Sequence, residues 1–272
     1  MFTLYFTLAL FGFLAGITTL LFGFGGGFII VPLLYRTLLT LYGADSPIGH
    51  AAMHIAVATS TCVMIVTSAM ATRRHWRRGN LILGLAWPLA GYIALGAVAG
   101  SLLANATHGG VIRWLFVAYL ALTIADGLLR KGFISQQART ALHQPTAGKT
   151  ALIGVVIGAI ATFLGVGGSV MTVPMMRRRG LSMNIATAMA NPLSMPVAIV
   201  GTLTYMMAAP GAASLPGHWY WGYVDMLAFV VLLAGSWLGM QTATPWVGRI
   251  PDKLHARIYL VLLTLVLLTM AF

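Results

Sequence analysis

The stretch GFGGGFIIVP at residues 23–32 recurs as GVGGSVMTVP at residues 165–174, and five of the ten positions are identical without a gap. A second block, MHIAVA at 53–58, has its counterpart in MNIATA at 183–188. Chance does not account for glycine and proline recurring at this density. The sequence therefore predicts two copies of one unit, residues 1–135 and 148–272, joined by a cytoplasmic linker at 136–147.

The composition is that of a membrane protein. Hydrophobic residues make up 59% of the 272 residues and charged residues only 7%, whereas about a quarter of a typical soluble domain is charged. Apolar runs of about 20 residues recur, each long enough to cross the bilayer as a helix. We therefore expect an all-α polytopic membrane protein of two inverted repeats, each a broken glycine-rich helical hairpin plus three transmembrane helices. The expected segments are a hairpin at 2–42 with helices near 50–72, 80–104 and 112–130, then a hairpin at 150–176 with helices near 181–207, 222–246 and 254–272.

The basic residues predict how the chain is threaded through the bilayer. Of the 16 lysines and arginines, 14 lie in four clusters, at 73–78, 130–149, 177–179 and 249–257, and the connections at 43–49, 105–111 and 208–221 hold none. The positive-inside rule places the four clusters in the cytoplasm. The second hairpin then enters and returns from inside and the first from outside. The alternative is that the first hairpin crosses completely, because residues 4–22 alone are long enough to span, which would put the amino terminus inside.

The glycine clusters are candidate binding elements. A helix break inside a bilayer exposes backbone N–H and C=O groups that lipid cannot satisfy, so it must lie against protein or a polar cavity. The segment after each cluster is expected to start a half-helix, whose free N–H groups and positive dipole end attract anions. Close helix packing is the alternative explanation. The expected substrate-binding residues here are Gly25, Gly26, Gly27, Gly167, Gly168 and Ser169.

The helix after each hairpin carries a polar line. Steps of three and four place five residues on one face: His54, Val57, Thr61, Met64 and Ser68 in the first copy, and Asn184, Thr187, Asn191, Ser194 and Ala198 in the second. We add Ser60, Thr61, Asn191 and Ser194 to the expected substrate contacts. For Asn191 and Ser194, interhelical hydrogen bonding is an equally weighted alternative. These donors are neutral, which suits an anion that must be released again.

The remaining chemistry-bearing residues are sparse. His50 and His54 are four residues apart and are candidates for proton handling, with metal binding less favoured because no carboxylate or cysteine is near them in the sequence. The single cysteine, Cys62, excludes a disulfide within the monomer. We expect no cofactor and no metal. Despite the net charge of +12, the basic residues do not form the aromatic-interleaved face of a nucleic-acid binder.

Two further glycine pairs predict close helix contacts. Gly96 and Gly100 in the first half, and Gly235 and Gly239 in the second, are each four residues apart. Such pairs allow helix backbones to approach closely in lipid.

These features resemble the TauE/SafE family of sulfite and sulfonate exporters. The similarity lies in the two glycine-proline blocks, the Ala-Thr-Ser at 58–60, and His75 followed by Gly79. It implies a multi-pass permease of the bacterial inner membrane for sulfur-containing anions. We expect a secondary transporter, an exporter, of a small anion such as sulfite, thiosulfate or an organosulfonate, with proton coupling and a homodimer left open. The alternatives are a membrane-embedded metal-dependent enzyme and an anion channel.

Overall fold

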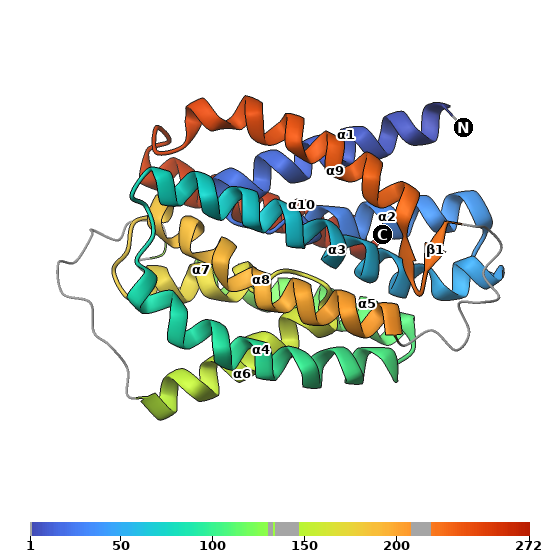
Figure 1. Cartoon of the computed structure of the whole chain (residues 1–272), viewed down its shortest axis with the longest axis horizontal. Coiled ribbons are helices and arrows are strands. Elements are labelled where there is room, and N and C mark those ends of the chain that lie inside the picture. Colours follow the sequence, from blue (N-terminus) through green and yellow to red (C-terminus); the bar gives the residue numbers. More distant parts are fainter. Residues whose placement is uncertain (1, 130–132, 134–146, 208–218) are drawn as a thin grey trace.

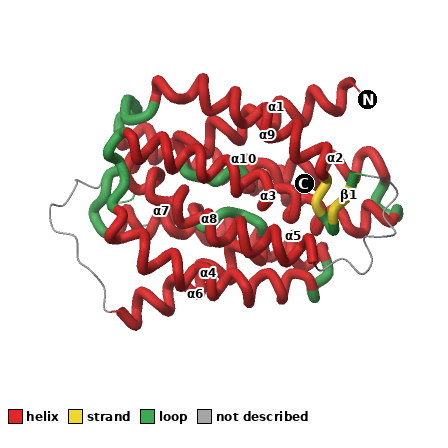
Figure 2. Tube along the Cα trace, viewed as in Figure 1, coloured by secondary structure: helices red, strands yellow, loops and turns green. Residues whose placement is uncertain are grey.

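The long apolar segments fold into helices that lie alongside one another in one bundle (Figures 1 and 2). The computed structural model describes residues 2–129, 133, 147–207 and 219–272. Within these residues the helices are α1 (Phe2–Phe22), α2 (Gly27–Tyr42), α3 (Pro47–Arg77), α4 (Leu83–Asn105), α5 (Gly109–Leu129), α6 (Ala147–Leu164), α7 (Ser169–Arg178), α8 (Met183–Met207), α9 (Met226–Ala243) and α10 (Asp252–Ala271).

Three small elements complete the described chain. The strands β1 (Tyr220–Trp221) and β2 (Val224–Asp225) form an antiparallel pair before α9, with Tyr220 opposite Asp225. A single turn of 3₁₀-helix, Thr244–Trp246, follows α9. Most of the expected linker at 136–147, together with Arg130, Lys131 and Arg139, lies outside the described residues.

Seven of the described helices are long and apolar enough to cross a membrane: α1, α3, α4, α5, α8, α9 and α10. The apolar helices α2 and α6 are shorter, and α7 has only 10 residues. The expectation of an all-α polytopic membrane protein is therefore confirmed.

The two hairpins enter the bundle from opposite ends (Figure 1). Helix α1 starts, and α2 ends, at the end of the bundle where the label N lies. Helix α6 starts, and α7 ends, at the opposite end. The arginines at the end of α3 and of α7, and the basic residues at the start of α10, lie at the α6–α7 end. The amino-terminal end of α1 thus lies opposite the basic end of the bundle.

The glycine pairs let helices of the two halves approach until their backbones are in contact. In α4, a methyl group placed on Gly96 would lie 2.0 Å from the carbonyl oxygen of Val155 in α6. In α9, one on Gly239 would lie 2.0 Å from the carbonyl oxygen of Phe13 in α1. No side chain fits at either position, so the predicted close contacts exist, between α4 and α6 and between α1 and α9.

Candidate functional site

The first break separates α1 from α2, and only glycine suits its backbone. Gly23, Gly25 and Gly26 have φ of 73°, 69° and 90°, in the left-handed region that side-chain-bearing residues rarely adopt. All three are buried. The Thr67 hydroxyl of α3 donates to the Gly25 carbonyl at 2.9 Å. The break is thus enclosed by protein, as a non-helical segment at membrane depth must be.

Two histidines satisfy carbonyls that the end of α1 leaves without helical partners. His75 Nε2, from α3, lies 2.9 Å from the Leu20 carbonyl oxygen. His255 Nε2, from α10, lies 2.8 Å from that of Leu21. Both rings are buried, and each must carry its proton on Nε2 to donate to a carbonyl. The end of α1 is therefore fastened to two separate helices.

The second break separates α6 from α7. Gly165 has φ of 68°, and a methyl group on it would lie 2.5 Å from a methyl of Val57 in α3. The Ser60 hydroxyl lies 2.8 Å from the Val57 carbonyl and 3.3 Å from that of Gly165. Since α3 also contacts the first break, this one helix supports both.

The two breaks lie against each other inside the bundle. A methyl group on Gly27, the first residue of α2, would lie 2.6 Å from the Gly165 carbonyl oxygen. From this point α2 and α7 run towards opposite ends of the bundle (Figure 1), so both positive dipole ends lie at the centre. Neither amino terminus has a side-chain cap, because the residues at the cap positions are Gly26 and Gly168.

Buried polar atoms without partners belong to residues beside both breaks, Ser68 next to Gly25 and Thr172 next to Gly168. Among the described residues, the Ser68 hydroxyl, the Thr172 hydroxyl and the Asn191 Oδ1 have no hydrogen-bond partner. Ser68 Oγ lies 3.4 Å from where a methyl group on Gly25 would be. A buried polar atom left unpaired costs about 1–3 kcal/mol, so a ligand that paired with it would recover this energy.

Serine hydroxyls of the second copy lie at the second break. Ser194 Oγ lies 2.7 Å from where a methyl group on Gly167 would be, and it donates to the Ala190 carbonyl at 2.9 Å. Ser169 Oγ lies 3.4 Å from the Gly167 carbonyl. Gly168 faces the Ile157 side chain. The side chains that approach the glycines of the two breaks most closely are uncharged.

Other expected site residues lie apart from the breaks. Thr61 packs against Gly201 of α8, and its hydroxyl donates within α3 to Ala58. His50 is exposed at the start of α3, and His54 Nε2 lies 3.2 Å from the Thr107 carbonyl oxygen after α4. Both histidines are therefore at the end of the bundle opposite the basic clusters. Within the described residues, no group of three or more His, Cys, Asp or Glu is placed to hold a metal ion.

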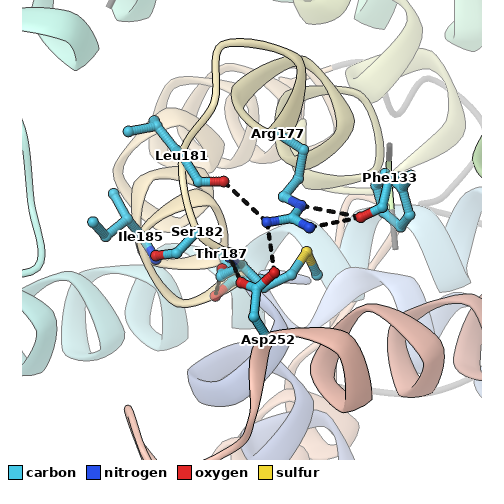
Figure 3. A network of polar contacts seen from close by, with 8 residues as sticks. Phe133, Arg177, Leu181, Ser182, Ile185, Thr187 and Asp252 are labelled. Atoms are coloured by element: carbon cyan, nitrogen blue, oxygen red, sulfur yellow. Dashed lines mark hydrogen bonds and ion pairs between the residues drawn. The ribbon is translucent and has the colours of Figure 1, made fainter. Parts of the chain in front are cut away.

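Arg177, at the end of α7, is buried rather than facing solvent. It is 1% exposed, and its guanidinium forms an ion pair with Asp252 of α10 at 2.9 Å. It also donates to the Phe133 carbonyl, at 2.7 Å from Nη2, and to the Leu181 carbonyl at 3.1 Å (Figure 3). Asp252 accepts the Met183 N–H at 2.6 Å on its other oxygen. The charge is thus compensated locally and serves to join α7, α8 and α10.

Several residues near the breaks were not among the expected substrate contacts. Met64 and Ser68 belong to the polar line of α3 but carry no ionisable group. Thr67 lies beside that line, and Tyr259, whose hydroxyl lies 3.5 Å from the Ser169 carbonyl, is in α10. The steps of four and three from Ser60 to Met64 and on to Thr67 place these residues on one face of α3, and this spacing could have indicated them from the sequence.

Comparison with known proteins identifies the family. Residues 8–270 match the family model described as sulfite exporter TauE/SafE. The chain belongs to the TauE/SafE family. TauE/SafE membership and the names of its relatives make it a membrane transporter.

The relatives of this TauE/SafE protein cover nearly all of it. A probable membrane transporter protein of Haemophilus influenzae is 25% identical over 254 residues, which cover 92% of each chain. The probable membrane transporter protein YdhB of Bacillus subtilis is 24% identical over 88% of this chain and 89% of its own. One from Methanocaldococcus jannaschii is 23% identical, with 85% and 83% covered. No solved structure gives a significant match.

Proposed function

We propose that this protein is a secondary transporter that exports small sulfur-containing anions such as sulfite, thiosulfate or organosulfonates, and that the anion binds between the two glycine breaks. The observation that carries the proposal is the meeting of the breaks: Gly27 lies against the Gly165 carbonyl, and two uncapped half-helices begin there. The family description, sulfite exporter, supports the substrate class. The relatives' names specify a transporter but no solute.

The chemistry around the breaks suits an anion that is bound and then released. Helix amino termini offer N–H donors and a positive dipole end, and the buried Ser68 and Thr172 hydroxyls lack partners. The buried cation Arg177 is already paired with Asp252 and with backbone carbonyls. An anion held only by neutral donors dissociates more readily than one paired with a buried guanidinium.

The helix pairing supports alternating access by two inverted repeats. If α1–α5 corresponds to α6–α10, the contact of α1 with α9 corresponds to that of α6 with α4. Both pairs are held by glycines against backbone carbonyls, and the two hairpins enter from opposite ends. We place the protein in the bacterial inner membrane, with the basic end of the bundle in the cytoplasm.

Proteoliposomes loaded with labelled sulfite or methanesulfonate test this proposal. Wild-type protein should give saturable efflux, whereas a channel would give flux that rises linearly with concentration. Gly167→Ala should reduce that flux at least tenfold, because the methyl group would lie 2.7 Å from Ser194 Oγ. The matched control is Gly91→Ala, which meets no atom within 4 Å. Equal flux in the two variants would show that the anion does not pass between the breaks.

A further inference from the structure

We propose that Met64 is the gate of the transport path, and that its side chain occupies the anion's place when the site is empty. This inference rests on the proposed function, and it adds a residue that neither the family nor the relatives' names assign. The sulfur of Met64 lies between the two breaks: a methyl group on Gly25 would be 2.8 Å from Sδ, and one on Gly167 would be 2.8 Å from the same atom.

Position 167 requires glycine because a side chain would clash with neighbouring atoms, and not because of the backbone conformation. Gly25 has a positive φ, but Gly167 is not among the residues with positive φ, so its backbone would accept a side chain. What excludes a side chain there is its closeness to two atoms, the Met64 sulfur at 2.8 Å and Ser194 Oγ at 2.7 Å from the added methyl group. Both breaks therefore leave room for one methionine side chain.

The groups next to Met64 suit an anion better than a thioether. Ser68 Oγ is buried and unpaired and lies next to Gly25, while the amino terminus of α2 has no side-chain cap. A thioether sulfur is at best a weak hydrogen-bond acceptor. The described conformation thus leaves the donors of the site incompletely satisfied.

Methionine is suited to leaving such a position. Its side chain is unbranched and has three rotatable bonds, so it adopts alternative packings more readily than leucine or isoleucine. Its Cγ, Sδ and Cε atoms are comparable in size to a small oxyanion. Rotation of Met64 away from Gly25 and Gly167 would open the space between the breaks and expose Ser68 and Ser194 to the solute.

A thermal-unfolding cycle tests where Met64 lies without requiring transport. Gly167→Ala should lower the melting temperature in detergent by several degrees, and the loss in the double variant with Met64→Ala should be smaller than the sum of the two single losses, because the new methyl group then has room. The control is Ile93→Ala, a fully buried truncation in α4 whose loss should add in full to that of Gly167→Ala. Equal behaviour of the two truncations would refute the placement of Met64 between the breaks.

Cysteine accessibility tests the gate. Cys62 is the only cysteine, so Cys62→Ala gives a cysteine-free background into which Met64→Cys and, as control, Ile93→Cys are placed. In membranes, a small charged methanethiosulfonate reagent should modify the thiol at 64 at least tenfold faster than that at 93. Methanesulfonate should slow the reaction at 64 only. Equal modification rates at positions 64 and 93 would refute the proposal that Met64 is a gate.

Transport separates failure of the gate from failure of the function. Met64→Ala should lower the KM for methanesulfonate several-fold, because no side chain must be displaced, and Met64→Phe should abolish flux. If wild type transports but Met64→Ala changes KM no more than Ile93→Ala does, the gate is wrong and the function stands. If wild type moves none of the sulfur anions while position 64 is still reached by the reagent, the substrate class is wrong and the path through Met64 stands.

Discussion

Replacing Asp252 with alanine should destabilise the protein, because it leaves the buried Arg177 without its counter-ion. Arg177 is 1% exposed, and its ion pair with Asp252 measures 2.9 Å. Removing one partner of a buried pair costs about 3–5 kcal/mol. Asp252 itself is 35% exposed, so water screens part of the interaction. We therefore expect the free energy of unfolding to fall by about 3 kcal/mol, the lower end of this range. The Met183 N–H also loses its acceptor.

The structure provides a matched control at the same end of the bundle. Arg178 forms an ion pair with Asp126 of α5, and its side chain is 52% exposed. Exposed pairs contribute about 0–1 kcal/mol. Arg178→Ala should therefore cost under about 1 kcal/mol. Asp252→Asn, which keeps an acceptor for Met183, should fall between Arg178→Ala and Asp252→Ala.

The assay is thermal unfolding of purified protein in one detergent, followed by tryptophan fluorescence, with size-exclusion chromatography to confirm that each variant is monodisperse. The expected order of melting temperatures, from highest to lowest, is wild type, Arg178→Ala, Asp252→Asn, Asp252→Ala. If Asp252→Ala and Arg178→Ala lower the melting temperature equally, the buried pair does not join α7 to α10 as described.

Three further changes can be checked by the same measurement. Gly239→Ala should prevent the close contact of α9 with α1 and cost about 1–3 kcal/mol through overpacking, since its methyl group would lie 2.0 Å from the Phe13 carbonyl. His75→Ala should cost about 1–3 kcal/mol of stability, because it leaves the Leu20 carbonyl unpaired. Asp225→Ala should cost about 1 kcal/mol of stability, because the carboxylate caps α9 through two N–H groups, and Asp225→Asn should recover most of that loss. A wild-type melting temperature in any of these alanine variants would contradict the contact concerned.

The sequence predicted the breaks because a broken membrane helix requires a particular residue type. Gly25 and Gly165 have positive φ, and glycine adopts such a backbone without steric cost. The position of these glycines in the chain could therefore be translated directly into local structure. The same holds for Gly96 and Gly239, where only the absence of a side chain allows the helices to touch.

The polar line predicted on α3 meets the breaks only in part: Val57, Met64 and Ser68 lie beside glycines of the breaks. The polar line passed through Thr61, which packs on Gly201 of α8. The side chains that contact the breaks include Ser60 and Thr67, each offset by one position from the line at Thr61 and Ser68. Helix α3 is buried among several neighbours, so hydroxyls on more than one face find partners, and periodicity alone does not rank the faces.

The burial of Arg177 depends on tertiary contacts. Within a run of three arginines, the sequence indicates only a cytoplasmic cluster. Which of them points inward is set by the rotation of α7 and by Asp252, 75 residues further along the chain. His75 is similar, because the carbonyl that it pairs with belongs to Leu20, 55 residues away.

The contact between α1 and α9 has a consequence for biogenesis. Ser236 donates to the Gly12 carbonyl across 224 residues of sequence, so α1 can meet α9 only after all the segments between them have been synthesised. Until then the glycine face of α1 is exposed to lipid or to the insertion machinery. Assembly therefore cannot proceed half by half: α1 docks late, and a nascent chain released before α9 has emerged would lack the helix that receives it.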